Sequence, residues 1–309
     1  MAVTAALVKE LRERTGAGMM DCKKALVETD GDIEKAIDYL REKGIMKAQK
    51  KAGRIAAEGL VRVAFGEGNK TASIVEVNSE TDFVAKNEEF IEFVEDLAKE
   101  VLVKGNMPME QFMAEPFGEG TVQETLTAKV AKIGENLSIR RFAKVEEDGV
   151  VYVGYTHGGG RIGVIVDADT DVVNDTVKEA MHNIAMQIAA LNPKYVSRDE
   201  VSADYIAHEK EILLAQIMND PKESQKPEKV INGMIEGRIS KELKEVCLVD
   251  QVYVKAEDGK QTVAKYLEEV SKAVGGTVKV KRFVRFETGE GLEKKQEDFA
   301  AEVAAQMNA

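Results

Sequence analysis

Apolar residues recur at helical spacing through the first fifty positions of the chain. Thr4, Asp21 and Asp32 each precede such a stretch, where a side-chain oxygen can cap a helix. Gly16 and Gly44 are expected to end the first and third helices, because glycine readily adopts the left-handed conformation that closes a helix. The pattern predicts a three-helix bundle, and so small a core favours a docking module.

A pattern typical of β-strands follows and occurs twice. Gly59–Phe65 and Ala72–Val77 flank a glycine-rich hairpin turn and lead into a helix-periodic stretch. The same plan returns about ninety residues later, where Gly149–Tyr155 and Arg161–Val166 precede a second helical stretch. The repetition predicts two α+β subdomains with antiparallel sheets.

The second copy of this plan is interrupted. Between Pro193 and Leu243 the periodicity predicts two antiparallel helices, which as an inserted hairpin would form a protruding arm for a partner. Strand character returns over Val246–Val254 and Thr277–Phe286. The last stretch, Asp298–Gln306, predicts a short Ala-rich helix.

The predicted fold class is therefore α+β with several domains. We divide the chain into a docking domain (1–55), a first core subdomain (56–145), a second core subdomain (146–190 and 246–290), an inserted helical hairpin (191–245) and a C-terminal helical module (291–309).

The distribution of charge indicates a boundary near residue 54. The chain carries a net charge of −12, but residues 1–54 carry +3 and the remainder −15. So acidic a protein is not expected to bind nucleic acids or anionic membranes broadly. The basic run from Arg41 to Arg54 has no interleaved aromatic residues for base stacking, so a solvated helix or linker is favoured there.

Cysteine usage and apolar runs indicate the compartment. Cys22 and Cys247 are far apart, which excludes a disulfide scaffold and a Cys-rich zinc module and fits a reducing cytosol. The apolar runs are too short to span a bilayer, and the start, Met1–Arg14, carries charged residues where a signal peptide would need an apolar stretch. We expect a cytoplasmic protein.

Strings that resemble enzyme motifs fail in their context. Gly158–Gly163 matches Gly-x-Gly-x-x-Gly, but a strand is predicted after it where a dinucleotide site needs a helix. His157–Gly160 resembles an esterase oxyanion loop, yet no serine stands in Gly-x-Ser-x-Gly. We therefore expect no catalytic group, nucleotide site, cofactor or metal, and His157 is expected to lie on a polar hairpin turn.

Met19 and Met20 stand between glycines and the second helix. Because adjacent residues rarely share one face, one of the two is expected to fill the bundle core and the other to offer an adaptable contact to a partner.

The segment Thr81–Val84, called the 81–84 turn below, has two interpretations. Thr81 or Asp82 can cap the helix that runs to Val101, with Phe83 or Val84 packed against its first turn. From the residues alone this interpretation is favoured about two to one over a partner contact.

Two strings are more specific than these patterns. Thr15–Ala25 (TGAGMMDCKKA) and Thr81–Asn87 (TDFVAKN) resemble the signature sequences of the bacterial elongation factor Ts family. Further strings resemble the same family and stand in the same order along the chain. These are Lys132–Asn136 with Arg140 and Arg141, His157–Val164, Arg282–Gly291 and the tail Asp298–Ala304.

The resemblance implies a function. The family promotes guanine-nucleotide exchange on elongation factor Tu, the GTPase that carries aminoacyl-tRNA to the ribosome, and makes or breaks no bond itself. It implies that the N-terminal bundle is ubiquitin-associated-like and docks on the GTPase domain. It also implies that Asp82 and Phe83 wedge between helices of that domain near the magnesium ion of Mg-GDP, which reverses the odds against a contact.

The same resemblance leaves open a homodimer or a complex with two copies of each protein. It also implies further contacts with the partner. The implied partner-binding residues are Arg12, Met19, Met20, His157, Phe299 and Val303, and the implied exchange residues are Thr81, Asp82, Phe83 and Val84. Two rival classes, an adaptor that uses only the bundle and an RNA- or ribosome-binding protein that uses Arg41–Arg54, are less favoured.

Overall fold

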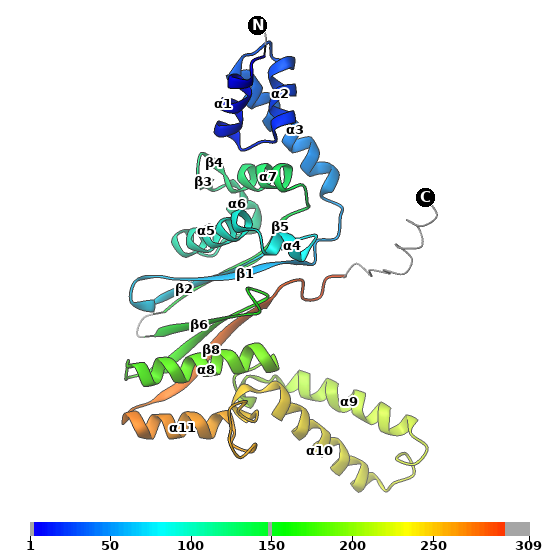
Figure 1. The fold of residues 1–309 in the computed structure, drawn as a ribbon. Coiled ribbons are helices and arrows are strands. Elements are labelled where there is room, and N and C mark those ends of the chain that lie inside the picture. Colours follow the sequence, from blue (N-terminus) through cyan, green and yellow to red (C-terminus); the bar gives the residue numbers. More distant parts are fainter. Residues whose placement is uncertain (1–2, 148–149, 294–309) are drawn as a thin grey trace.

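The computed structural model describes residues 3–147 and 150–293. Figure 1 shows its units stacked along one long axis, with a helical bundle at the N-terminal end, two layered α+β units in the middle and a helical hairpin that projects sideways at the other end. Both larger sheets are antiparallel, so the α+β class is confirmed.

The N-terminal bundle packs around buried Leu11, Cys22 and Leu26. As predicted, the hydroxyl of Thr4 and the carboxylate of Asp32 accept backbone N–H bonds at helix starts, and Gly16 ends the first helix at φ 65°. The bundle consists of α1 (Ala5–Thr15), α2 (Met19–Glu28) and α3 (Ile33–Lys51).

Two boundary predictions in the bundle are wrong. The second helix begins at Met19 after Gly18, and Asp21 lies in its first turn, where it forms an ion pair with Lys47 (2.9 Å). Gly44 does not end α3, because the helix continues along a neighbour: a Cβ at Gly44 would lie 3.5 Å from that of Ala131. The basic run is thus helical and packs the bundle against the next unit.

The first core unit is a meander sheet in the order β1-β2-β5, covered on its outer face by helices. Its core contains buried Phe90, Phe93, Leu97 and Val101 from the longest of these helices. The segment 104–123 contains a short helix and a small two-stranded sheet. The elements are β1 (Glu58–Phe65), β2 (Thr71–Ser79), α4 (Asp82–Ala85), α5 (Glu88–Lys104), α6 (Met109–Ala114), β3 (Pro116–Phe117), β4 (Gly120–Thr121), α7 (Val122–Ile133) and β5 (Ser138–Glu146).

The second core unit repeats the meander in the order β6-β7-β8, with two helices on its outer face. The repeat that the sequence predicted is therefore present in the strands and in the first long helix of each copy, α5 and α8. Its elements are β6 (Val151–His157), β7 (Ile162–Thr170), α8 (Asp175–Leu191), α11 (Val263–Val274) and β8 (Val278–Glu287).

The two sheets pack face to face. Val61, Ile74, Tyr152 and Ile165 are buried between them. Glycine allows the close approach, because a Cβ at Gly163 would lie 2.5 Å from Cγ1 of Val61. The sheets therefore form one sandwich with helices on both outer faces (Figure 1).

The inserted hairpin is present as predicted and consists of α9 (Ala203–Asn219) and α10 (Glu228–Val246). It does have a core of its own, which includes Ile217, Ile235 and Ile239. The strand predicted over Val246–Val254 is wrong: this segment forms a 3₁₀ turn at Leu248–Asp250 and two isolated β-bridges, because the residues pack as a connector under α8.

We predict that Gly163→Ala lowers the free energy of unfolding by about 1–3 kcal/mol, since the added methyl group overlaps Val61 across the sandwich. Gly233→Ala is the matched control. Gly233 lies on the exposed face of α10 with open space around it, so alanine there raises helix stability by up to about 1 kcal/mol. Urea unfolding followed by circular dichroism measures both. A neutral Gly163→Ala would show that the sheets do not pack as closely as described.

Candidate functional site

The 81–84 turn begins at the end of β2 and forms the one-turn helix α4. Val84 is buried against the first core, whereas Phe83 is 79% exposed. The long helix that follows is capped by Asn87, whose Oδ1 accepts the N–H of Phe90 (3.2 Å). The prediction that Thr81 or Asp82 caps the helix to Val101 is therefore wrong, because α4 and Lys86 intervene.

Thr81 is held from a distant segment. Its side chain makes no capping bond to α4; its hydroxyl donates to Oε1 of Glu135 (2.6 Å) and its N–H donates to Oε2 (3.0 Å). Glu80 reciprocates, since its Oε1 accepts the N–H of Asn136 (2.6 Å). The start of the turn is thus fixed to the residues that precede β5.

The exposed side of the turn carries one apolar and two charged groups. Nζ of Lys86 donates to Oδ2 of Asp82 (2.6 Å) and lies 5.9 Å from the ring centre of Phe83. The hydrogen bond from Lys86 lowers the pKa of the Asp82 carboxyl, which is therefore ionised at neutral pH. A large aromatic ring in water beside a charged pair is unusual for a residue that only stabilises the fold.

The corresponding segment of the second copy differs. There the link from β7 to α8 contains no helical turn, and Val172, the counterpart of Phe83, packs against the second core. The hydroxyl of Thr170 donates to the carbonyl of Val172, and its oxygen accepts the N–H of that residue, so the segment closes on itself. Only the first copy presents an aromatic ring.

His157 ends β6 and begins a tight turn, residues 157–161, as predicted. It is exposed, and its Nδ1 shares a hydrogen bond with the hydroxyl of Tyr155 (2.8 Å). Gly160 has φ 115° and its carbonyl accepts the N–H of Val61 (2.7 Å). This bond joins the 157–161 turn of the second sheet to β1 of the first.

A hollow of about 320 Å³ lies beside this turn. Tyr155, His157 and Ile162 line it from the sheet, and Met186 and Val254 line it from the helical side. The wall is mostly apolar, so the surface around His157 is suited to an apolar side chain with a polar rim.

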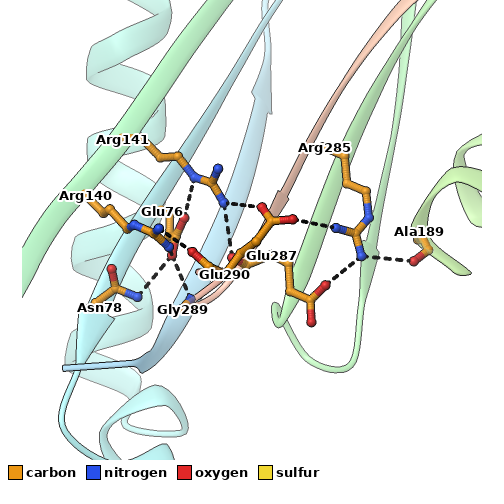
Figure 2. A network of polar contacts seen from close by, with 9 residues as sticks. All are labelled: Glu76, Asn78, Arg140, Arg141, Ala189, Arg285, Glu287, Gly289 and Glu290. Carbon is orange, nitrogen blue, oxygen red and sulfur yellow. Dashed lines mark hydrogen bonds and ion pairs between the residues drawn. The ribbon is translucent and has the colours of Figure 1, made fainter. Parts of the chain in front are cut away.

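A buried carboxylate joins the two sheets at the same end of the sandwich. Glu76 in β2 is 0% exposed and accepts hydrogen bonds from the residues that we call the Glu76 clasp (Figure 2). The donors are Asn78 Nδ2 (3.1 Å), Arg140 Nη1 (3.0 Å), Arg141 Nε (2.6 Å) and the N–H of Gly289 (2.8 Å).

The clasp extends into the second sheet. Arg141 also reaches Oε2 of Glu290 (3.0 Å), and Glu290 lies 3.7 Å from Nη1 of the buried Arg285 in β8. Arg285 in turn contacts Glu287 (2.7 Å), as Figure 2 shows. The clasp therefore fixes the point at which the chain leaves β8, beside the 157–161 turn, where the carbonyl of Arg161 accepts the N–H of Thr288 (2.9 Å).

The bundle residues lie apart from these turns. Arg12 is exposed on the last turn of α1, and Met19 and Met20 are 58% and 73% exposed at the start of α2. The expectation that one methionine fills the core is wrong, because Cys22, Ala25 and Leu26 already occupy the inward positions of this helix. Phe299 and Val303 lie outside the described residues.

Glu135, Arg140 and Arg141 lie in the family motifs, but the sequence alone indicates no role for them. Nothing in their local pattern shows that they bind residues 54 and 64 or more positions away.

Within residues 3–147 and 150–293, no cluster of three His, Cys, Asp or Glu side chains could hold a metal. Across the same residues, no helix is long and apolar enough to cross a membrane.

Comparison with known proteins gives a consistent result. The family model described as Elongation factor TS matches residues 80–290. Elongation factor Ts of Clostridioides difficile (strain 630) is 55% identical over 306 residues, which cover 99% of both chains. The proteins of that name from Clostridium novyi (strain NT) and Clostridium botulinum (strain Eklund 17B / Type B) are 53% and 52% identical, again over 99% of each chain.

We predict that Glu76→Ala lowers the free energy of unfolding by about 3 kcal/mol, because it leaves two guanidinium groups and a backbone N–H without their buried acceptor. Glu236→Ala removes an exposed ion pair with Lys210 (2.6 Å) and serves as the control, with an expected loss below about 1 kcal/mol. Urea unfolding compares the two. Equal losses would contradict the role given to the clasp.

Proposed function

The chain belongs to the elongation factor Ts family and is a translation elongation factor, and on that premise we propose that it binds elongation factor Tu carrying GDP and accelerates release of the nucleotide. GTP then rebinds to the emptied partner. The protein makes and breaks no bond in this proposal and uses no cofactor of its own.

The exposed ring of Phe83 is the observation that supports this proposal best. It projects from a turn that is fixed on both sides, by Glu135 at Thr81 and by the burial of Val84. A rigid aromatic group can displace packed side chains of a partner, because protein interiors are poorly compressible and switch between discrete arrangements. Asp82 beside it can accept hydrogen bonds from donors at a displaced helix end.

Release of GDP would follow from loss of the partner's magnesium contacts. Mg²⁺ is the largest local positive charge that holds nucleotide phosphates and protein oxygens together. A wedge at Asp82 and Phe83 that shifts its surroundings therefore weakens nucleotide binding. Because the coupling is reciprocal, nucleotide also weakens the binding of this protein, so the complex turns over.

The remaining surfaces supply affinity in this proposal. Arg12, Met19 and Met20 would dock on the GTPase domain, since exposed methionines adapt to an apolar groove. His157 and the hollow beside it would meet the partner's third domain. Phe299 and Val303, which lie outside the described residues, would contact the GTPase domain.

The experiment that tests the proposal is stopped-flow release of a fluorescent GDP analogue from elongation factor Tu of the same organism, with this protein in catalytic amounts. Strong acceleration supports exchange. No acceleration by a folded protein would contradict it and favour an adaptor. Binding that weakens steeply with salt would instead favour an RNA partner.

We predict that Asp82→Ala combined with Phe83→Ala lowers the exchange rate at least a hundredfold while the fold is kept, because both side chains are exposed on the 81–84 turn. Val103→Ala is the matched control, since Val103 is a 75% exposed apolar residue at the far end of α5. Circular dichroism checks the fold. An unfolded or fully active double variant would refute the wedge.

We predict that Met20→Ala raises the half-saturating concentration of this protein several-fold and leaves the maximal exchange rate nearly unchanged, because docking of the bundle is remote from the 81–84 turn. Titration in the same stopped-flow assay separates the two parameters. An unchanged half-saturating concentration would count against a docking role for α2.

A further inference from the structure

We propose that Glu135 is a positioning residue for nucleotide exchange: it clamps the start of the 81–84 turn so that Phe83 meets the partner on a support that does not yield. This inference rests on the proposed function. It assigns to Glu135 an effect on exchange that acts through Thr81 and needs no contact with the partner.

The first argument is the unusual bonding of Thr81. A threonine at the N-cap position normally accepts an N–H from the first turn of its own helix. Thr81 has extended N-cap geometry (φ −128°, ψ 157°) but makes no such bond. Both of its donors go to the two carboxylate oxygens of Glu135, 54 positions away in the chain.

The second argument is that α4 cannot hold its own position. It contains four residues, and so short a helix gains too few hydrogen bonds to offset the cost of ordering its backbone. Its direction must therefore come from contacts outside the helix. At its start these are the long-range bonds of Thr81 to Glu135 and the local bond from the hydroxyl of Ser79 to the Thr81 carbonyl (2.9 Å).

The third argument is that the clamp is reciprocal. Glu135 receives two bonds from Thr81, and Glu80 receives the N–H of Asn136. Gly134 ends α7 at φ 89°, and Glu135 and Asn136 follow it directly. Charge-assisted bonds of this kind are shorter and stronger than neutral ones.

The second copy supplies an internal comparison. There, too, the residue before the third strand meets the link after the second, since the N–H of Thr277 donates to Oδ1 of Asp171 (2.7 Å). The hydroxyl of Thr170 instead bonds to Val172, within its own link. The two-oxygen grip from the segment before the third strand is present only in the copy that exposes an aromatic ring.

Phe83 can displace side chains of the partner only if the 81–84 turn keeps its position when the partner binds. When the turn can move, binding energy is used to reorder the turn and not to displace the partner's side chains, so the maximal rate falls more than the affinity. Loss of Glu135 is therefore expected to act on the maximal exchange rate.

The test uses the full chain with Glu135→Ala, Glu135→Gln, Thr81→Val and Thr81→Ser, and Glu119→Ala as the control because Glu119 is an exposed glutamate on another turn. In the stopped-flow assay we expect Glu135→Ala to lower the maximal rate at least tenfold, with the half-saturating concentration changed by less than about threefold. Glu135→Gln keeps one acceptor and loses less, Thr81→Val loses more than Thr81→Ser, and Glu119→Ala changes nothing.

A second measurement needs no partner. Amide hydrogen exchange of the free protein is expected to rise at least tenfold at Thr81 in Glu135→Ala, while amides of β7 stay protected. The double variant Thr81→Val with Glu135→Ala should lose little more activity than either single variant, because both changes remove one interaction.

Several results would overturn the inference. These are an unchanged Thr81 amide, an unchanged maximal rate, additive losses in the double variant, or a rise of the half-saturating concentration alone, which would make Glu135 a direct contact. A wild-type protein that does not accelerate GDP release overturns the proposed function and the kinetic role together, and the hydrogen exchange result then still decides whether the clamp itself exists.

Discussion

The carboxylate of Glu76 is the interaction on which the arrangement of the molecule depends. A buried negative charge is costly unless every lone pair has a donor, and here four donors from three separate chain segments converge on it. Apolar packing between the sheets is non-directional, whereas these hydrogen bonds are directed. They fix the position of the first sheet relative to the second sheet and to the point where the chain leaves β8. The 81–84 and 157–161 turns therefore have a defined separation.

The rest of the core shows how one plan supports two different surfaces. Both units use the same antiparallel meander with a long helix on the outer face. They differ in the link that joins the second strand to that helix, where one copy buries Val172 and the other exposes Phe83. Loops can change in this way because the strands beneath them carry the stability. The duplicated scaffold thus leaves one link free to specialise.

Local patterns predicted the regular elements well because they depend on near neighbours. The caps at Thr4 and Asp32, the glycine-rich hairpin turn and the amphipathic helices all follow from spacing. The prediction failed where a distant partner decides the outcome. Gly44 stays helical because α7 packs against it, and Val246–Val254 lacks the neighbouring strand that it would need. Thr81 was one of two candidate caps for the helix to Val101, but its hydroxyl bonds to an acceptor that stands 54 residues away. The family motifs marked these positions without giving the contacts that explain them.

The order in which the chain is synthesised gives the interrupted second unit a consequence. The first sheet is built from residues 58–146 and can form as soon as they are available. The second must wait for β8, which pairs with β7 only after the whole hairpin has been made. The bond between Gly289 and Glu76 spans 213 positions, so it can form only after the hairpin and β8 have been made. A nascent chain can therefore carry a folded first sheet in which Glu76 still lacks the N–H of Gly289. The 81–84 and 157–161 turns take their final relative positions only after β8 and Gly289 have been made.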